Sequence, residues 1–168
     1  MCAMLFFATT VNYMDRQVLS LTWKDFISPE FHWNDEIYGN ITAVFSLLYA
    51  VANLFAGKFV DWMGTKKGYL WAILVWSLGA VLHAFCGIFT EGWMGGDFTS
   101  KEALIGATGD AVLVISTVSM YAFLFCRCVL ALGEAGNFPA AIKVTAEYFP
   151  KKDRAFATSI FNSGASVG

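Results

Sequence analysis

Most of this 168-residue sequence consists of apolar runs that are each about as long as a membrane-crossing helix. Backbone polar groups find no partners in hydrocarbon, so a run of roughly 20 mainly apolar residues crosses a bilayer as a helix. Hydrophobic residues make up 57% of the chain. Charged residues make up 14%, against roughly 25% in an ordinary soluble domain. The sequence therefore predicts an all-α membrane protein.

We expect four complete spans and the start of a fifth. The predicted ranges are 1–23, 38–57, 69–89 and 112–148, with the fifth span beginning at 155–168. The glycine-bearing segment 90–111 is predicted to be an irregular outer loop. The opening residues lack the basic start and small-residue cleavage site of a secretory signal, so we interpret them as part of the first span. Hydrophobic runs reach both ends of the chain, and we therefore expect a fragment of a longer protein.

Basic residues gather in two of the connections between these spans. They are Lys58, Lys66, Lys67, Lys151, Lys152 and Arg154. The other connections carry only Lys24 and Lys101 as basic residues and are rich in acidic ones. Because cytoplasmic loops carry an excess of lysine and arginine, we expect the two basic connections and the amino terminus to be cytoplasmic.

Two groups of polar side chains lie in the middle of apolar spans. In the first span, Asn12 is three residues from Asp15 and four from Arg16, so these side chains share one helix face. In the fourth span, Arg127 and Glu134 are seven residues apart, and a polar stripe continues to Asn137. Ionisable groups at membrane depth are costly and usually mark a functional path. The alternative interpretation is an ion pair that only holds helices together.

The chemistry of these groups divides between binding an anion and carrying protons. Arginine stays charged and grips a carboxylate with two parallel hydrogen bonds, so Arg16 and Arg127 are candidate binders of an anionic substrate. Asp15 and Glu134 are candidate proton carriers, since a desolvated carboxylate gains a proton readily. Moving one negative charge into a negative interior costs about 2.3 kcal/mol per 100 mV, which entering protons would offset.

The remaining reactive residue types do not form a recognisable site. The cysteines lack metal-ligand and C-x-x-C spacing, and we interpret Cys2, Cys86, Cys126 and Cys128 as small buried hydrophobes. His83 is interpreted as hydrogen-bonded structure, with proton relay as the alternative. We therefore expect no metal, no cofactor, no nucleic-acid partner and no enzymatic activity.

Several motifs resemble those of one transporter family. The segment GKFVDWMGTKKG, residues 57–68, resembles the loop between helices two and three of the major facilitator superfamily, although Trp62 and Thr65 stand where many members have arginine. The segment EYFPKKDR, residues 147–154, resembles a second cytoplasmic loop of that superfamily. Together with NYMDRQVLS and RCVLALGEAGNFPAAIKVTAEYFPKKDRAFATSIFNSG, these motifs are similar to bacterial hexuronate transporters of the anion:cation symporter branch.

The resemblance implies a bundle of twelve helices in two six-helix halves, with this chain forming part of the first half. It implies proton-coupled import of galacturonate or glucuronate by alternating access, in a bacterial inner membrane, by a monomer that includes the carboxyl-terminal half. In that family Arg16 would bind the substrate carboxylate, Asp15 and Glu134 would carry protons, and Tyr13 would contact sugar hydroxyls. Further candidates for the substrate site are Asn12, Arg127 and Asn137. The cytoplasmic gating network would include Asp61, Glu147 and Arg154.

Two other functions remain open at this point. One is a carrier of the same superfamily for another organic anion, such as an aldonate, glucarate or a phosphate ester. The other is a membrane module that transports nothing, in which the charges hold helices together or recruit a partner.

Overall fold

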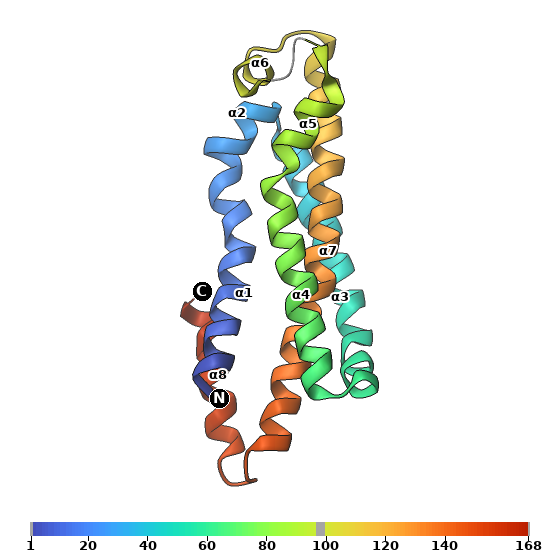
Figure 1. Cartoon of the computed structure of the whole chain (residues 1–168). Coiled ribbons are helices and arrows are strands. Elements are labelled where there is room, and N and C mark those ends of the chain that lie inside the picture. The colour runs from blue at the N-terminus through green and yellow to red at the C-terminus, as the bar shows by residue number, and fades with distance from the viewer. Residues whose placement is uncertain (1, 97–99, 168) are drawn as a thin grey trace.

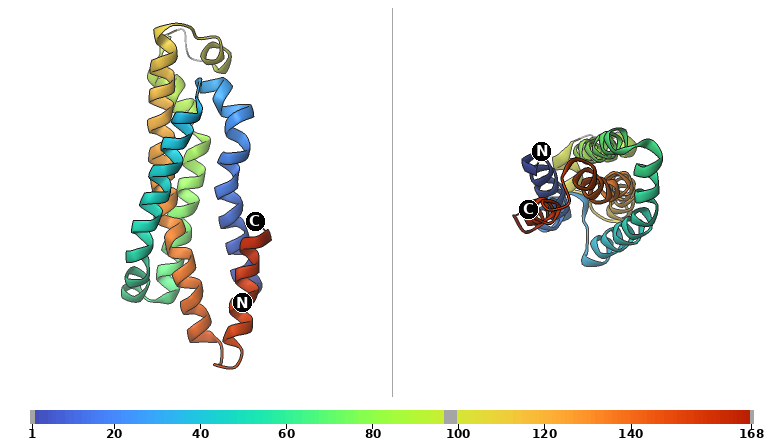
Figure 2. Two further views of the ribbon diagram at one scale, coloured as in Figure 1. Left: turned by 180° about the vertical axis from the view of Figure 1, so that it is seen from behind. Right: turned by 90° about the horizontal axis from the view of Figure 1, so that it is seen from below.

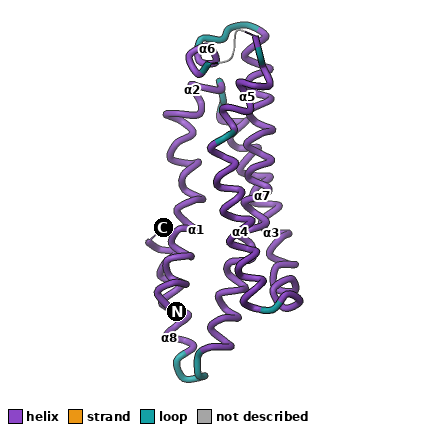
Figure 3. The backbone as a smooth tube through the Cα atoms, in the orientation of Figure 1, coloured by secondary structure: helices purple, strands orange, loops and turns teal. Residues whose placement is uncertain are grey.

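The computed structural model describes residues 2–96 and 100–167, and their regular elements are helices (Figure 1). Loops lie mainly at the two ends of the bundle (Figure 3). In chain order the elements are α1 (Cys2–Thr22), the π-helix η1 (Trp23–Ile27), α2 (Ser28–Phe31), α3 (Asp35–Met63), α4 (Thr65–Ala84), α5 (Cys86–Met94), α6 (Lys101–Ile105), α7 (Asp110–Tyr148) and α8 (Arg154–Val167).

The long helices form two groups that run side by side. Helix α7 packs along α4 and α3, whereas α8 packs along α1 (Figures 1 and 2). The α3–α4 and α7–α8 turns lie at the end of the bundle where the chain starts, and α2 and α6 lie at the other end. We call these the inner and outer ends. This arrangement brings α1 and α7, which carry the intramembrane charges, into one bundle.

Helix α3 is longer than the apolar run that predicted it, and the connections that follow contain more helix than expected. Helix α3 covers Asp35–Met63 rather than 38–57, and the predicted loop 57–68 is helical except at Gly64, which has φ +81°. The predicted outer loop 90–111 includes the end of α5, all of α6 and the start of α7. The apolar pattern stops where a helix leaves hydrocarbon, but backbone hydrogen bonding continues into water. Hydropathy therefore underestimated the length of α3 and the helix content of the connections.

Three helices of the described residues are long and apolar enough to cross a membrane: α3, α4 and α7. Helix α1 has 21 residues but does not reach the same apolarity. Its middle carries the polar run from Asn12 to Gln17. A polar stretch of this kind survives inside a membrane protein when its side chains face protein or a water-filled cavity. In this bundle α1 faces α8 on one side and α7 on another.

Glycines allow α4 and α7 to approach closely. A Cβ atom added at Gly79 would lie 2.7 Å from the backbone nitrogen of Leu130, and one added at Gly133 would overlap the backbone of Trp76. A Cβ at Gly136 would lie 2.8 Å from the Cβ of Ala72. Lipid tails are as apolar as leucine, so membrane helices gain from close packing of small residues. We call the contacts at Gly79, Gly133 and Gly136 the α4–α7 seam. The seam fixes the position of α4 along the axis of α7.

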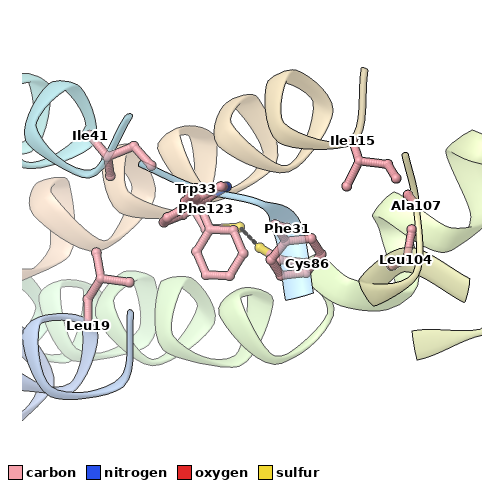
Figure 4. Packing of buried hydrophobic residues seen from close by; sticks show 10 residues of the cluster. Leu19, Phe31, Trp33, Ile41, Cys86, Leu104, Ala107, Ile115 and Phe123 are labelled. Atoms are coloured by element: carbon pink, nitrogen blue, oxygen red, sulfur yellow. Dashed lines mark hydrogen bonds between the residues drawn. The ribbon is translucent and has the colours of Figure 1, made fainter. Parts of the chain in front are cut away.

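The outer half of the bundle holds an apolar cluster. Its buried members are Leu19, Phe31, Trp33, Ile41, Cys86, Leu104, Ala107, Ile115, Phe123 and Cys126 (Figure 4). The Trp33 indole donates a hydrogen bond to Ser119 Oγ at 2.9 Å, and the Sγ atoms of Cys86 and Cys126 lie 3.5 Å apart. Cys2 and Cys128 are only partly buried. The cluster ties the loops of the outer end to the long helices.

An ion pair joins two short helices above this cluster. Lys101 Nζ of α6 lies 2.6 Å from Glu30 Oε2 of α2. The hydrogen bond and the negative charge of Glu30 raise the pKa of Lys101. The lysine side chain is 58% exposed, so the pair contributes little stability. It orients α6 over the bundle.

A smaller apolar cluster joins α1, α7 and α8 near the inner end. Leu5, Ala141, Val144 and Phe161 are its buried members. Gly164 permits the close approach of α8, since an added Cβ would lie 2.7 Å from the carbonyl oxygen of Phe6. These contacts hold the inner half of α1 beside α7.

Candidate functional site

A buried ion pair joins α1 to α7 in the middle of the bundle. Arg16 Nε donates to Glu134 Oε2 at 2.9 Å, and Glu134 is 1% exposed. Within residues 2–96 and 100–167, Arg16 Nη2 and Glu134 Oε1 are buried without a hydrogen-bond partner. Leaving such atoms unpaired is costly, so polar ligands or waters are expected at these positions. The pair therefore keeps one free donor and one free acceptor.

Two tyrosines hold the Arg16 guanidinium by its flat face. Its central carbon lies 4.0 Å from the ring centre of Tyr49 and 5.2 Å from that of Tyr13. A cation over an aromatic face is attracted by the ring, and the contact leaves the edge of the guanidinium available for hydrogen bonds. Tyr13 was a predicted site residue, and Tyr49 was not.

Within residues 2–96 and 100–167, Asp15 forms no salt bridge with a basic residue. Its Oδ2 accepts a hydrogen bond from the indole nitrogen of Trp76 at 2.7 Å. Trp76 lies in the α4–α7 seam beside Gly133 and is 6% exposed. The indole of a buried tryptophan needs an acceptor, and here the carboxylate supplies it. Asp15 and Arg16 therefore point toward different helices, α4 and α7.

Arg127 lies in α7, 5% exposed, with its guanidinium 5.2 Å from the ring centre of Phe45. Its Nε has no hydrogen-bond partner among the described residues. Arg127, Asp15 and His83 line one cavity of about 180 Å³. His83 Nδ1 is 2.7 Å from the carbonyl oxygen of Gly79, and among the described residues its Nε2 is buried without a hydrogen-bond partner. Three helices thus bring polar groups to one small cavity.

The two asparagines of the predicted polar stripes are also buried. Asn12 and Asn137 are each 3% exposed. In the described part of the chain, Asn12 Nδ2 and Asn137 Oδ1 lack hydrogen-bond partners. The predicted residues of α1 and α7 therefore bring a further unpartnered donor atom and a further unpartnered acceptor atom into the bundle.

A larger cavity, of about 540 Å³, lies between α1, α3 and α7 on the inner side. It is lined by Tyr13, Tyr49, Asn53, Gly57, Val60, Asp61, Phe138, Pro139, Ile142 and Lys143. Small-molecule sites generally have volumes of roughly 300–1,000 Å³. Its lining includes both tyrosines that hold Arg16, so the cavity borders the buried pair.

In the part of the chain that the structure describes, no hydrogen bond or salt bridge joins the three predicted gating residues to one another. Asp61 Oδ1 pairs with Lys143 Nζ at 2.8 Å. Arg154 donates instead to the carbonyl oxygens of Phe149 and Ala146, at 3.0 and 2.5 Å, where α7 ends. Glu147 is exposed. The inner end is therefore joined by a pair that includes an unpredicted lysine.

The contacting residues missed from the sequence include Tyr49, Trp76 and Lys143. Lys143 was detectable, because it is a basic residue inside a predicted span, where charges usually have a role. Trp76 lies in the middle of its span rather than at an interface, which is itself a signal that its indole needs a buried partner. Tyr49 carries no comparable signal in the sequence.

The family model and the similar proteins point to the same family. The model of the family described as "Major Facilitator Superfamily" matches residues 5–168. "Probable galactarate/D-glucarate transporter GarP" of Escherichia coli (strain K12) is 30% identical over 159 residues, covering 95% of this chain and 30% of that protein. "Probable galactarate/D-glucarate transporter GudP" of Pseudomonas putida is 32% identical over 160 residues, covering 95% and 29%.

A third relative is named for a different sugar acid. "Hexuronate transporter" of Escherichia coli (strain K12) is 27% identical over 168 residues, covering 100% of this chain and 32% of that protein. The chain thus spans less than a third of the length of these relatives. No solved structure matches it. The family model covers nearly the whole chain, which therefore belongs to the major facilitator superfamily and is a membrane protein.

Proposed function

We propose that this chain is the part of a secondary transporter that binds a sugar acid and couples its import to protons. The proposal is supported by relatives that are named as transporters of galactarate, D-glucarate and hexuronates. It is supported equally by a polar site inside an apolar bundle. The complete transporter would also contain the part that corresponds to the regions of the relatives that this chain does not cover.

The observation that carries the proposal is the buried pair of Arg16 and Glu134. In the described residues, the pair has one free donor at Nη2 and one free acceptor at Oε1. A carboxylate arriving at Nη2 would compete with Glu134 for the guanidinium, since both are anions seeking the same donors. Protonation of Glu134 would weaken its hold on Arg16 and so favour the substrate. Binding of a proton and of an anion are thereby linked.

The other predicted residues take supporting roles around this pair. Arg127 would attract the anion from the outer side, where it shares a cavity with Asp15. Asp15 is a second proton carrier, held by Trp76. The Tyr13 hydroxyl and the amides of Asn12 and Asn137 would bond to sugar hydroxyls. Such groups provide orientation and specificity in small-molecule sites.

A substrate with two carboxylates is a second candidate beside a hexuronate. The relatives named for galactarate and D-glucarate are 27–32% identical to this chain, and those named for hexuronate or galacturonate are 25–27% identical. Two arginines inside the bundle, the partly buried Arg16 and the buried Arg127, would be available to two carboxylates. The sequence motifs predict a hexuronate first. Competition between a hexuronate and D-glucarate for uptake decides which of the two substrate classes is preferred.

The proposal places the protein in a bacterial inner membrane with its inner end cytoplasmic. The basic residues of the α3–α4 and α7–α8 connections support this orientation. Asp61, Glu147 and Arg154 remain the predicted gating residues at that end. We call the cavity of about 540 Å³ the inner cavity and that of about 180 Å³ the outer cavity. Alternating access would open these two cavities in turn.

The proposal is tested in cells that express the transporter containing this chain. The experiment measures uptake of labelled galacturonate, glucuronate, galactarate and D-glucarate. We expect uptake of at least one of these acids, and we expect a protonophore to reduce it. Glu134→Gln should leave uptake that responds less to the proton gradient, because glutamine cannot gain a proton and only Asp15 remains as a carrier. Initial rates at several external pH values measure this.

Asp110→Asn is the matched control for Glu134→Gln, because it removes an exposed acid from the outer end of the same helix. Its uptake should keep the response to the gradient. Absence of uptake of any sugar acid would favour a module that transports nothing. Exchange against phosphate that ignores the gradient would favour a phosphate-ester carrier.

A further inference from the structure

Lys143 contributes a positive charge to the inner cavity, on the wall opposite α3. Its Nζ donates to Asp61 Oδ1 at 2.8 Å and to the carbonyl oxygen of Val60 at 3.3 Å. The lysine side chain is 24% exposed and that of Asp61 is 71% exposed. An ammonium group has three donors. In the described part of the chain two of them are used, so one remains for a further acceptor.

The inner cavity leads from the Arg16 pair to this lysine. On α3 its lining residues Tyr49, Asn53, Gly57 and Asp61 follow one another at intervals of four and therefore share one face. Twelve residues of helix separate Tyr49 from Asp61, a rise of about 18 Å. Tyr49 lies under the Arg16 guanidinium, and Asp61 lies at the inner end. The cavity thus has a cation near each end.

We propose that Lys143 forms a second carboxylate-binding site, which the transported anion occupies on the cytoplasmic side before release or after entry from that side. This inference rests on the proposed function. The ligand is the carboxylate of a sugar acid, bound by the free donor of the ammonium group. Asp61 competes for the same ammonium group and so keeps the substrate from being held too tightly.

A purely structural role for Lys143 makes a different prediction about its partner. If the Lys143–Asp61 pair only clamps α3 to α7, removing either charge breaks the same clamp and the two variants behave alike. If Lys143 binds the substrate, removing its charge weakens binding. Removing Asp61 instead frees the ammonium group and strengthens binding. The two halves of one ion pair therefore have opposite effects.

The experiment measures exchange of labelled substrate in membrane vesicles that contain the transporter, without a proton gradient. Right-side-out vesicles report the KM at the outer face, and inside-out vesicles report it at the cytoplasmic face. For Lys143→Gln we expect the cytoplasmic KM to rise about tenfold, as for loss of a charge-assisted hydrogen bond, while the outer KM stays unchanged. For Asp61→Asn we expect the cytoplasmic KM to fall.

Lys143→Arg keeps the charge and is expected to retain most of the cytoplasmic affinity. Lys58→Gln removes an exposed charge of α3 near the same end and is expected to change neither KM. Transporter amounts in the vesicles are matched by immunoblot, so that poor folding of a variant is visible. Equal changes at both faces, or changes of the same sign in Lys143→Gln and Asp61→Asn, would overturn the inference. No exchange of any sugar acid by the unmodified transporter would instead overturn the proposed function.

Discussion

Replacing Arg16 with glutamine is expected to lower sugar-acid uptake about 100-fold, as for loss of a hydrogen bond to a charged group in a buried site. Two effects combine in this variant. The substrate carboxylate loses its fork of donors, and Glu134, which is 1% exposed, loses its partner. Initial uptake rates, corrected for the amount of transporter in the membrane, measure the effect.

Two further variants separate binding from folding. Arg16→Lys keeps the charge but not the planar fork and is expected to recover only part of the uptake. Removing one member of a buried pair leaves the other charge uncompensated, at a cost of about 3–5 kcal/mol. The double variant Arg16→Gln with Glu134→Gln removes both charges, so it should recover normal protein amounts without recovering uptake. Normal uptake by Arg16→Gln would contradict the proposed role.

Replacing Gly133 with alanine is expected to destabilise the protein by about 1–3 kcal/mol or more, which is typical of an overpacked core. The added methyl group would overlap backbone and side-chain atoms of Trp76. Backbone atoms of a neighbouring helix cannot rotate away as a flexible side-chain end does, so α4 and α7 must separate. The same shift would move the Trp76 indole away from Asp15. Thermal stability of the purified protein in detergent measures the loss.

Gly39→Ala is the control for Gly133→Ala. Gly39 lies within α3, and a Cβ added there meets no atom within 4 Å. Alanine is favoured over glycine in a helix interior by roughly 0.5–1 kcal/mol, so this variant should be neutral or slightly more stable. Two identical substitutions thus have opposite expected signs. Equal stability of both variants would show that the α4–α7 seam is not close-packed.

The helical faces were predictable because they depend only on the local period of the chain. Asn12, Arg127 and Glu134 were singled out as polar residues inside apolar spans, and the structure buries all three. The helix ends were less predictable, because hydropathy reports contact with lipid rather than backbone hydrogen bonding. Asn34 shows the difference. It caps α3 through a hydrogen bond from the Ile37 amide, well outside the apolar run.

By itself the sequence determined the class of the protein, the approximate positions of its long helices and the charged residues that they bury. Tertiary structure alone decided the partners of those charges. Glu134 bonds to Arg16, 118 residues away, and Asp15 bonds to a tryptophan 61 residues away. Asp61 bonds to a lysine 82 residues away. Residue spacing fixes what shares a helix face, but the glycine seam and the apolar clusters fix how far one helix is shifted along another, and that shift selects the partners.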